Sequence, residues 1–345
     1  MDLYPNSKIT AISPGKTILF GEHFVVYGYP SIVAAINKKF TASMTFGNST
    51  IRKIKITSSF GFTAEIVKST INISTRSSFS YDVIKKVADI LDSILRCNVN
   101  TIYDDSQRLS LDLHLSSDIP IGGGLGSSSA LCVALAGAIN YYCYKKIDKD
   151  SICRKSIDAE KVINKDTSGA DCSICTYGGF GIYDKKNGFR RSSFEGNDLS
   201  LLIIDTGIPH NTFEMVDKVR KIKNNNARLF NDLACRYQEV FNLALKSLQD
   251  KDNEKMGNLM DENHLLLRKL GVSTPLIDKI VDTCNSCSSL GTKITGAGGG
   301  GCVISLIDKR EHLLTEKLLQ KLDEFNLHYF FSEPDFDGLS VFDSN

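Results

Sequence analysis

A glycine-rich segment between an expected strand and an expected helix narrows the range of folds open to this chain. The segment reads Ile119-Pro120-Ile121-Gly122-Gly123-Gly124-Leu125-Gly126-Ser127-Ser128-Ser129. Closely spaced glycines let backbone N–H groups approach a ligand, and the helix that follows directs its unpaired N–H groups and positive dipole end to the same point. The pattern predicts a cradle for an anion. The alternative interpretation is a flexible turn with an ordinary serine N-cap.

Other glycine and serine motifs fit this chain less well. No lysine follows the glycines of the first segment, so it is not a Walker A loop. Residues 296–301 formally match the dinucleotide-binding pattern, but residues 302–307 predict a strand where that site needs a helix. We interpret this run as a hairpin that closes over a ligand. A hydrolase with Ser128 as nucleophile is a further alternative, weakened because Ala130 stands where the nucleophile elbow has its final glycine.

The periodicity of apolar residues predicts a first unit that combines a sheet with helices. Stretches rich in β-branched residues predict antiparallel strands within residues 7–13, 18–35 and 41–74. The apolar period then predicts a half-buried strand over 109–115 and helices over 81–97, 127–144 and 150–164. The helix over 127–144 is apolar nearly all round, which indicates burial.

A second unit follows a polar, glycine-bearing break over residues 188–198. It begins with a strand at 201–204 and contains a glycine-bearing strand pair around 293–307 and a final strand. Its expected helices cover residues 211–223, 227–249, 254–270, 275–287 and 311–325. We therefore predict an N-terminal domain over 1–197 and a C-terminal domain over 198–345.

Composition excludes several classes of protein. Of 345 residues, 42% are apolar, and 41 Lys and Arg nearly balance 40 Asp and Glu. This balance argues against a disordered chain and against a protein that grips nucleic acid or an anionic membrane. The apolar run over 131–139 is too short to span a bilayer, and residues 1–5 lack the pattern of a signal peptide. We expect a cytoplasmic protein with no membrane and no nucleic-acid partner.

Two pairs of cysteines have the spacing of zinc ligands, Cys172 with Cys175 and Cys284 with Cys287. Structural zinc sites usually place the second pair about 15 to 20 residues after the first, whereas these pairs lie far apart in the sequence. In a cytoplasmic protein most cysteines are reduced. We therefore expect buried thiols in preference to a metal site.

Three glycine-bearing segments, taken in order, are similar to the three motifs of the GHMP family of small-molecule kinases. They are residues 14–23, 119–129 and 293–302. Further segments look most like those of the family members that phosphorylate mevalonate, namely residues 21–28, 168–171, 176–179 and 205–212. The resemblance runs from about residue 9 to residue 307. Each motif alone has limited specificity, but the ordered set is a strong signal.

This resemblance implies an α+β, two-domain GHMP kinase fold. The N-terminal domain would be a ribosomal-S5-like sheet-and-helix unit with the phosphate loop, the C-terminal domain would be ferredoxin-like, and the active site would lie between them. The implied activity is ATP- and Mg²⁺-dependent phosphorylation of the 5-hydroxyl of mevalonate, a small-molecule substrate, to 5-phosphomevalonate in isoprenoid biosynthesis. Members of the family are often dimers, so a homodimer is compatible with the resemblance.

The resemblance also implies roles for individual residues. Asp171 matches the family's catalytic aspartate, which would accept the proton of the attacking hydroxyl. Lys16 matches a lysine beside that aspartate, where a cation favours the charged carboxylate and steadies the developing alkoxide. Glu160 and Ser128 match the glutamate and the hydroxyl that bind Mg²⁺.

Other matches concern the two substrates. Glu22, His23 and Thr206 match positions near bound mevalonate, although an alternative role for His23 is to hold its loop together. The expected ATP-binding residues form the phosphate loop and are Gly122, Gly123, Gly124, Leu125, Gly126, Ser127, Ser128 and Ser129. The active-site glycine loop of the second domain would comprise Gly296, Ala297, Gly298 and Gly299.

The sequence departs from the family pattern at several positions. Gly123 and Ser129 stand where relatives commonly carry alanine, Cys172 and Cys175 replace other residues beside the aspartate, and His210 stands where relatives often have arginine. The cradle and the base survive these changes, but acceptor specificity is less secure. Two alternatives therefore stay open: a GHMP kinase for phosphomevalonate, a sugar or homoserine, and a catalytically silent ligand-sensing regulator on the same fold.

Overall fold

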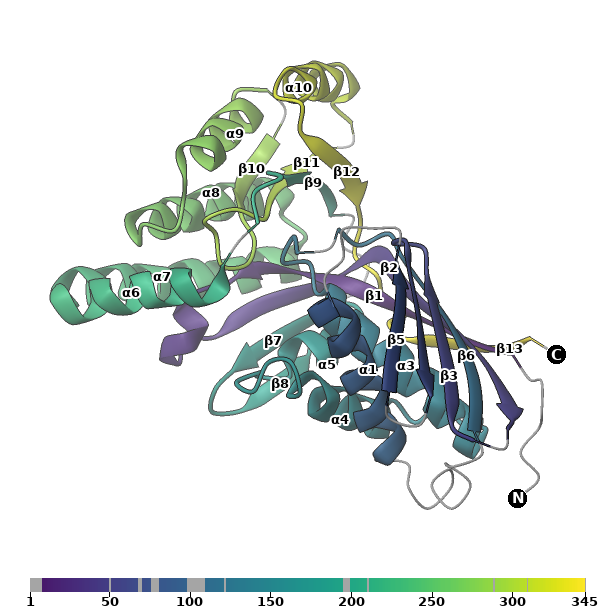
Figure 1. Ribbon diagram of the computed structural model, residues 1–345. Helices are drawn as coiled ribbons and strands as arrows, with labels where there is room; N and C mark the ends of the chain where they lie inside the picture. Colours follow the sequence, from purple (N-terminus) through teal and green to yellow (C-terminus); the bar gives the residue numbers. More distant parts are fainter. Residues whose placement is uncertain are drawn as a thin grey trace.

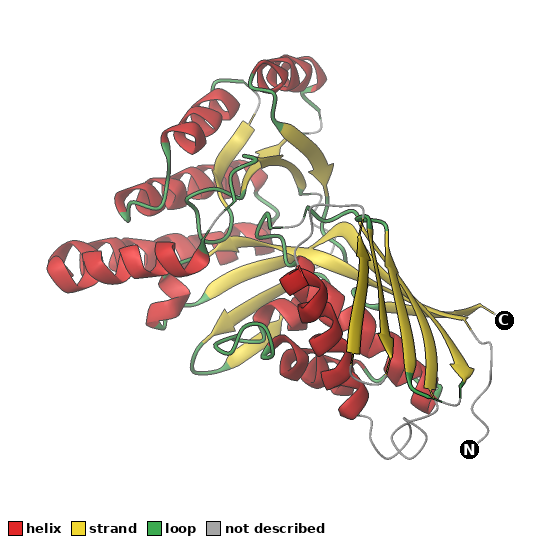
Figure 2. Cartoon of the chain, in the orientation of Figure 1, coloured by secondary structure: helices red, strands yellow, loops and turns green. Residues whose placement is uncertain are grey.

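The computed structural model describes residues 8–49, 51–67, 70–75, 81–97, 109–120, 122–194, 199–209, 211–287, 289–308 and 310–344. The chain forms two units, each a sheet with helices packed against it, as Figures 1 and 2 show. This combination of sheets and helices confirms the α+β class that the sequence predicts.

The first unit is built on a large sheet that is antiparallel except where β3 pairs with β6. Its strand order is β13-β1-β2-β6-β3-β4-β5, and the long β2 also pairs with β7, which pairs with β8. The strands are β1 (Lys8–Phe20), β2 (Ser31–Asn48), β3 (Lys53–Ser58), β4 (Phe62–Val67), β5 (Thr70–Thr75), β6 (Leu109–Ser117), β7 (Phe180–Asp184), β8 (Gly188–Arg191) and β13 (Ser340–Ser344).

Helix α3 (Ser127–Tyr144) lies at the centre of the first unit, against β1 and β2 and beside the other helices of this unit. Those helices are α1 (Tyr81–Arg96), α4 (Lys149–Glu160) and α5 (Ala170–Tyr177). Nearly all side chains of α3 are buried because they are small or aliphatic around the whole helix. Core packing therefore fixes the start of α3, where the phosphate loop ends.

The second unit has a four-stranded antiparallel sheet with the order β10-β11-β9-β12. In chain order this is the arrangement 2-3-1-4, which is the ferredoxin-like order expected from the resemblance. The strands are β9 (Ser200–Asp205), β10 (Ser289–Ile294), β11 (Cys302–Ile307) and β12 (His328–Ser332). The helices are α6 (Thr212–Asn225), α7 (Ala227–Asp250), α8 (Asn253–Lys269), α9 (Pro275–Asn285) and α10 (His312–Glu324).

An aromatic cluster joins the two units beside the turn between β1 and β2. This turn contains the short 3-10 helix η1 (Phe24–Tyr27), and the ring of Phe24 stacks on that of Tyr237 in α7 with 4.3 Å between centroids. The hydroxyl of Tyr237 donates a hydrogen bond of 2.6 Å to the carbonyl of Pro30. Because Tyr237 is fully buried, this contact orients the turn that carries Glu22 and His23.

The structure differs from the sequence prediction at both ends of the first sheet. β1 continues through Pro14 and Gly15, where the register to β2 shifts, so these residues form a bulge and do not end the strand. The last strand, β13, pairs with β1 and returns the end of the chain to the first sheet (Figure 1), although it falls within the range predicted for the second domain. The predicted boundary between residues 197 and 198 lies outside the described residues and stays a prediction.

The cysteines are free thiols, and most of them are buried. Within the described residues, no group of three or more His, Cys, Asp and Glu side chains is arranged to hold a metal ion. Burial raises the pKa of Cys172 and Cys175, and it raises the pKa of Cys284 to about 12. These thiols therefore pack as small apolar groups. The part of the chain that the structure describes contains no helix that could span a membrane.

The stability of the second unit is expected to fall in acid because of one buried histidine. His264 in α8 is 3% exposed, and burial lowers its pKa to about 4, from 6.5 in an unfolded chain. Between pH 4 and pH 6.5, His264 binds a proton in the unfolded chain and stays neutral in the folded chain. The free energy of unfolding should therefore decrease as the pH falls from 6.5 to 4, by about 3 kcal/mol in total.

Chemical denaturation across this pH range measures the effect. The variant His264→Gln should show a shallower loss of stability than the wild type, because a glutamine does not titrate. The matched control is His328→Gln, since His328 is exposed. An unchanged slope in His264→Gln would show that other groups cause the acid sensitivity.

Candidate active site

One edge of β1 holds the parts of the site together. β13 pairs with β1 only as far as Ile12, which leaves the next residues of this edge for other partners. The backbone N–H of Lys16 donates to the carbonyl of Leu125 in the phosphate loop, at 2.9 Å. The backbone N–H of Ile18 donates to Thr295 Oγ1 at the end of β10, at 3.0 Å. The loop of the first unit and the hairpin of the second unit therefore meet beside Lys16.

Lys16 and Asp171 form an ion pair at this meeting point. Lys16 Nζ lies 3.1 Å from Asp171 Oδ2, and the two side chains are 6% and 36% exposed. Asp171 stands in the first turn of α5, which begins after Gly169 in the left-handed conformation. A helix N-terminus favours a carboxylate at this position. The structure thus brings together the two residues for which the resemblance implies a catalytic role, and it leaves the carboxylate accessible.

The phosphate loop presents backbone and hydroxyl groups to a cavity of about 570 Å³. Gly122, Gly124 and Gly126 have φ near +80°, a conformation that favours glycine. The loop residues that line the cavity are Gly122, Gly124, Leu125, Gly126, Ser127 and Ser128. α3 begins at Ser127, so its unpaired N–H groups and dipole point to the same space. This geometry is the one that the predicted anion cradle requires, and the binding of an anion there stays a prediction.

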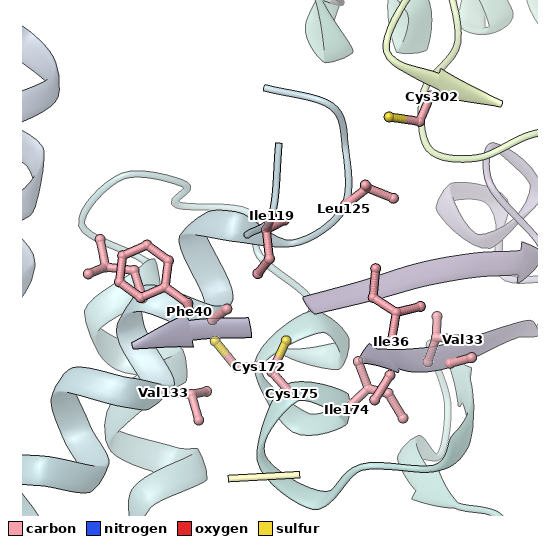
Figure 3. Packing of buried hydrophobic residues seen from close by; sticks show 14 of the residues in the cluster. Val33, Ile36, Phe40, Ile119, Leu125, Val133, Cys172, Ile174, Cys175 and Cys302 are labelled. Carbon is pink, nitrogen blue, oxygen red and sulfur yellow. The ribbon is translucent and has the colours of Figure 1, made fainter. Parts of the chain in front are cut away.

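The two loop residues that differ from the family pattern face away from the cavity. A Cβ atom on Gly123 would lie 2.9 Å from the sulfur of Cys302, so glycine at this position lets the second unit approach the loop. Figure 3 shows Cys302 beside the loop that carries Leu125. Ser129 is buried and donates a hydrogen bond to Glu160 Oε1. The Cβ position of Gly123 and the hydroxyl of Ser129 therefore face protein groups, and the place of both residues among the ATP-binding residues stays a prediction.

Glu160 lies behind the loop, where its carboxylate accepts hydrogen bonds from hydroxyl groups of the protein. Thr167 Oγ1 donates to Glu160 Oε2 at 2.6 Å, and the thiol of Cys172 lies 3.5 Å from the same oxygen. Ser128, in contrast, is exposed on the cavity wall. Carboxylate and hydroxyl oxygens are suitable ligands for Mg²⁺, so the chemistry of this pair fits the ion. A carboxylate oxygen can accept a hydrogen bond and also bind a cation, so the contacts with Ser129 and Thr167 leave Glu160 able to serve as a ligand.

Glu22 differs from its expected role, because its side chain is fully enclosed. The ammonium of Lys293 in β10 donates to Glu22 Oε1, and Asn263 Nδ2 in α8 donates to Glu22 Oε2 at 3.2 Å. Burial lowers the pKa of Lys293, and the neighbouring Glu22 acts in the opposite direction. Glu22 therefore reaches the cavity only with its backbone, and its carboxylate belongs to an ion pair between the two units.

His23 lines the cavity and fastens the glycine loop of the second unit. Its Nε2 donates to the carbonyl of Ala297 at 2.7 Å, and burial lowers the pKa of the ring. The imidazole is therefore neutral near pH 7, with its proton on Nε2. Gly296 and Ala297 also line the cavity, whereas a Cβ on Gly298 or Gly299 would press on Val272 or Met215.

Thr206 is not among the described residues that line the cavity. Its hydroxyl donates to the carbonyl of Gly301 at 2.8 Å, which closes the base of the glycine loop. Thr212, the first residue of α6, lines the cavity instead. The first turns of α3, α5 and α6 thus all face the same space, and their dipoles favour anionic ligands. His210, the other residue of this segment with an expected effect on the acceptor, lies outside the described residues.

A further part of the cavity wall is apolar, and sequence reasoning did not find it. It combines Phe60 with side chains of α1 and of the first sheet, namely Phe40, Phe62, Val83, Val87, Ile90 and Leu115. Lys293 was also missed, although one signal was available. A lysine beside Ile294 in a strand that otherwise reads as buried requires a carboxylate partner inside the protein.

Comparisons with known proteins agree with this geometry. The family profile for the GHMP kinases N terminal domain matches residues 83–179, and that for GHMP kinases C terminal matches residues 244–322. The mevalonate kinase of Pyrococcus horikoshii is 32% identical over 314 residues, which cover 88% of this chain and 90% of that protein. The mevalonate kinase of Methanocaldococcus jannaschii is 32% identical over 328 residues, with 92% and 97% covered.

A solved structure shows the same similarity in three dimensions. The crystal structure of L. major mevalonate kinase in complex with R-mevalonate superposes with a TM-score of 0.77 at 26% identity, and it covers 94% of this chain and 95% of that chain. Matches to both family profiles and to relatives above 30% identity extend over most of the sequence. The chain therefore belongs to the GHMP kinase family, and within it to the mevalonate kinases.

Proposed function

We propose that this protein transfers the γ-phosphoryl group of ATP to the 5-hydroxyl of mevalonate and so forms 5-phosphomevalonate and ADP. The observation that carries the proposal is the ion pair of Lys16 and Asp171, 3.1 Å apart at a cavity that also contains the phosphate loop. Relatives that cover most of the chain are mevalonate kinases, and one solved neighbour holds R-mevalonate. Both substrates are anions, which suits the three helix N-termini that face the cavity.

The proposed chemistry assigns each step to a group of this chain. Asp171 accepts the proton of the attacking hydroxyl, and Lys16 stabilises the negative charge that develops on the oxygen. Backbone N–H groups of the phosphate loop and of the first turn of α3 hold the triphosphate in line with that hydroxyl. The apolar wall beside α1 offers a surface for the nucleobase. A base bound there would remove the aromatic and aliphatic side chains of the wall from water, which is favourable.

Ser128 and Glu160 are the residues that would hold Mg²⁺. When bound, the ion would neutralise charge on the phosphates. We expect Glu160→Gln to weaken the binding of Mn²⁺ with a non-hydrolysable ATP analogue by about tenfold, measured by electron paramagnetic resonance. Thr167→Val is the matched control, since it removes a hydrogen bond to Glu160 and keeps its charge. Equal binding by Glu160→Gln and the wild type would remove Glu160 from the metal site.

A coupled assay of ADP release tests the proposed function. Mevalonate, phosphomevalonate, galactose and homoserine are compared as acceptors with ATP and Mg²⁺, and we expect turnover with mevalonate. Turnover of another acceptor without turnover of mevalonate would show that the protein is a kinase whose acceptor is not mevalonate. No turnover with any of the four would favour the ligand-sensing regulator. A cytoplasmic location and a homodimer stay predictions.

A further inference from the structure

The ion pair of Glu22 and Lys293 lies directly behind one wall of the cavity. Both side chains are fully enclosed. Lys293 Nζ also donates to the carbonyl of Ile294 at 2.6 Å and lies 3.5 Å from the carbonyl of Ile18. Asn263 is the second partner of the Glu22 carboxylate. The pair therefore joins the strand of Lys16 to the second unit.

The wall in front of this pair belongs to the acceptor side of the cavity. It contains His23 and Ala297, which are hydrogen-bonded to each other, and Thr212 lies in the same cavity. The phosphate loop, in contrast, provides the cradle for the triphosphate. This assignment rests on the proposed function, because an acceptor hydroxyl must reach Asp171 from the side that the nucleotide leaves free.

The charges around the cavity show why the pair matters for an anionic alcohol. Of the acidic residues in the lining, Asp171 has its cation, Lys16, inside the cavity. Glu22 has its cation behind the wall, where Lys293 is enclosed. A carboxylate that stayed charged without this cation would act through the low-dielectric protein wall on any anion in the cavity. His23 is neutral near pH 7 and would not compensate it.

We propose that Lys293 is a specificity-determining residue that acts through Glu22: its ammonium cancels the charge of the carboxylate behind the acceptor wall, and this lets the wall accept an anionic alcohol. Lys293 does not touch the reacting atoms, so it is a positioning residue and not a catalytic one. Removal of Lys293 makes the local charge more negative, and removal of the Glu22 charge makes it more positive. The two changes should therefore affect the KM for mevalonate differently.

Steady-state kinetics of four variants test the proposal. Lys293→Met should raise the KM for mevalonate tenfold or more and change the KM for ATP less than threefold. Glu22→Gln should leave the KM for mevalonate within threefold of the wild type or lower it. The double variant Glu22→Gln/Lys293→Met carries no charge in either place and should recover most of the mevalonate KM. Lys39→Met breaks the ion pair of Lys39 and Asp335 away from the cavity, and it should lower the melting temperature without this KM change.

The possible results separate the proposal from a merely structural role and from the proposed function. If Lys293→Met and Glu22→Gln raise the KM for mevalonate equally, or if the double variant is as poor as Lys293→Met, the charge-cancelling role is wrong. Should Lys293→Met fail to fold, the double variant decides, since a tenfold rise of its mevalonate KM would also overturn the role. Absence of mevalonate turnover in the wild type would instead reject the proposed function.

Discussion

Replacement of Asp171 by asparagine should lower kcat by about three orders of magnitude while the KM for ATP changes little. Asparagine has nearly the same shape as aspartate but cannot accept the proton of the attacking hydroxyl. The substitution also deprives Lys16 of the carboxylate that lies 3.1 Å from its Nζ. Steady-state and single-turnover measurements with saturating ATP would separate the loss of chemistry from a loss of binding.

The matched control is Asp150→Asn, because Asp150 also stands in the first turn of a helix, α4, and accepts a hydrogen bond from Tyr177. This control should keep kcat within a few-fold of the wild type. Lys16→Met combined with Asp171→Asn should cost little more than Asp171→Asn alone, since the two groups act as a unit. An Asp171→Asn variant that retains more than a tenth of wild-type turnover would show that another group accepts the proton.

Sequence patterns predict the parts of this fold that depend on local periodicity. The helix over residues 127–144 coincides with α3 because its side chains are apolar all round and bury it in the core. The pairing of Lys16 with Asp171 is different in kind. No local pattern connects two residues so far apart in the chain, and only the ordered similarity to the GHMP motifs predicts that they meet.

The sequence does not show which hydrogen-bond or ion-pair partner a polar side chain has in the folded chain. Glu22 matches a substrate position, yet a buried lysine from β10 and an asparagine from α8 bind its carboxylate. The resemblance implies that Glu160 and Ser128 bind the same ion, yet the neighbouring hydroxyl of Ser129 is the one that donates a hydrogen bond to Glu160. β13 joins the first sheet because the edge of β1 is open from Lys8 to Ile12, which only the three-dimensional arrangement reveals.

Replacement of Gly126 by alanine should lower kcat/KM for mevalonate by about a hundredfold or more. A Cβ on Gly126 would lie 2.6 Å from Lys16 Cγ and 3.4 Å from the Lys16 backbone nitrogen. Because Cγ lies close to the main chain, rotation about the outer bonds of the lysine does not relieve this clash. The whole side chain must shift, and the ammonium then moves away from Asp171. A displacement of about 1 Å at a catalytic group can cost two orders of magnitude in rate.

Gly188→Ala separates this displacement from ordinary backbone strain. Gly188 has a φ of +71°, close to the +77° of Gly126, but a Cβ there meets no atom within 4 Å. Chemical denaturation should show a loss of about 1 kcal/mol of stability in Gly188→Ala from the left-handed conformation, and a larger loss in Gly126→Ala because its methyl group also presses on Lys16. Only Gly126→Ala should lose activity, because only its methyl group reaches Lys16. Equal losses of kcat/KM in the two variants would mean that strain in the backbone, and not the position of Lys16, limits the reaction.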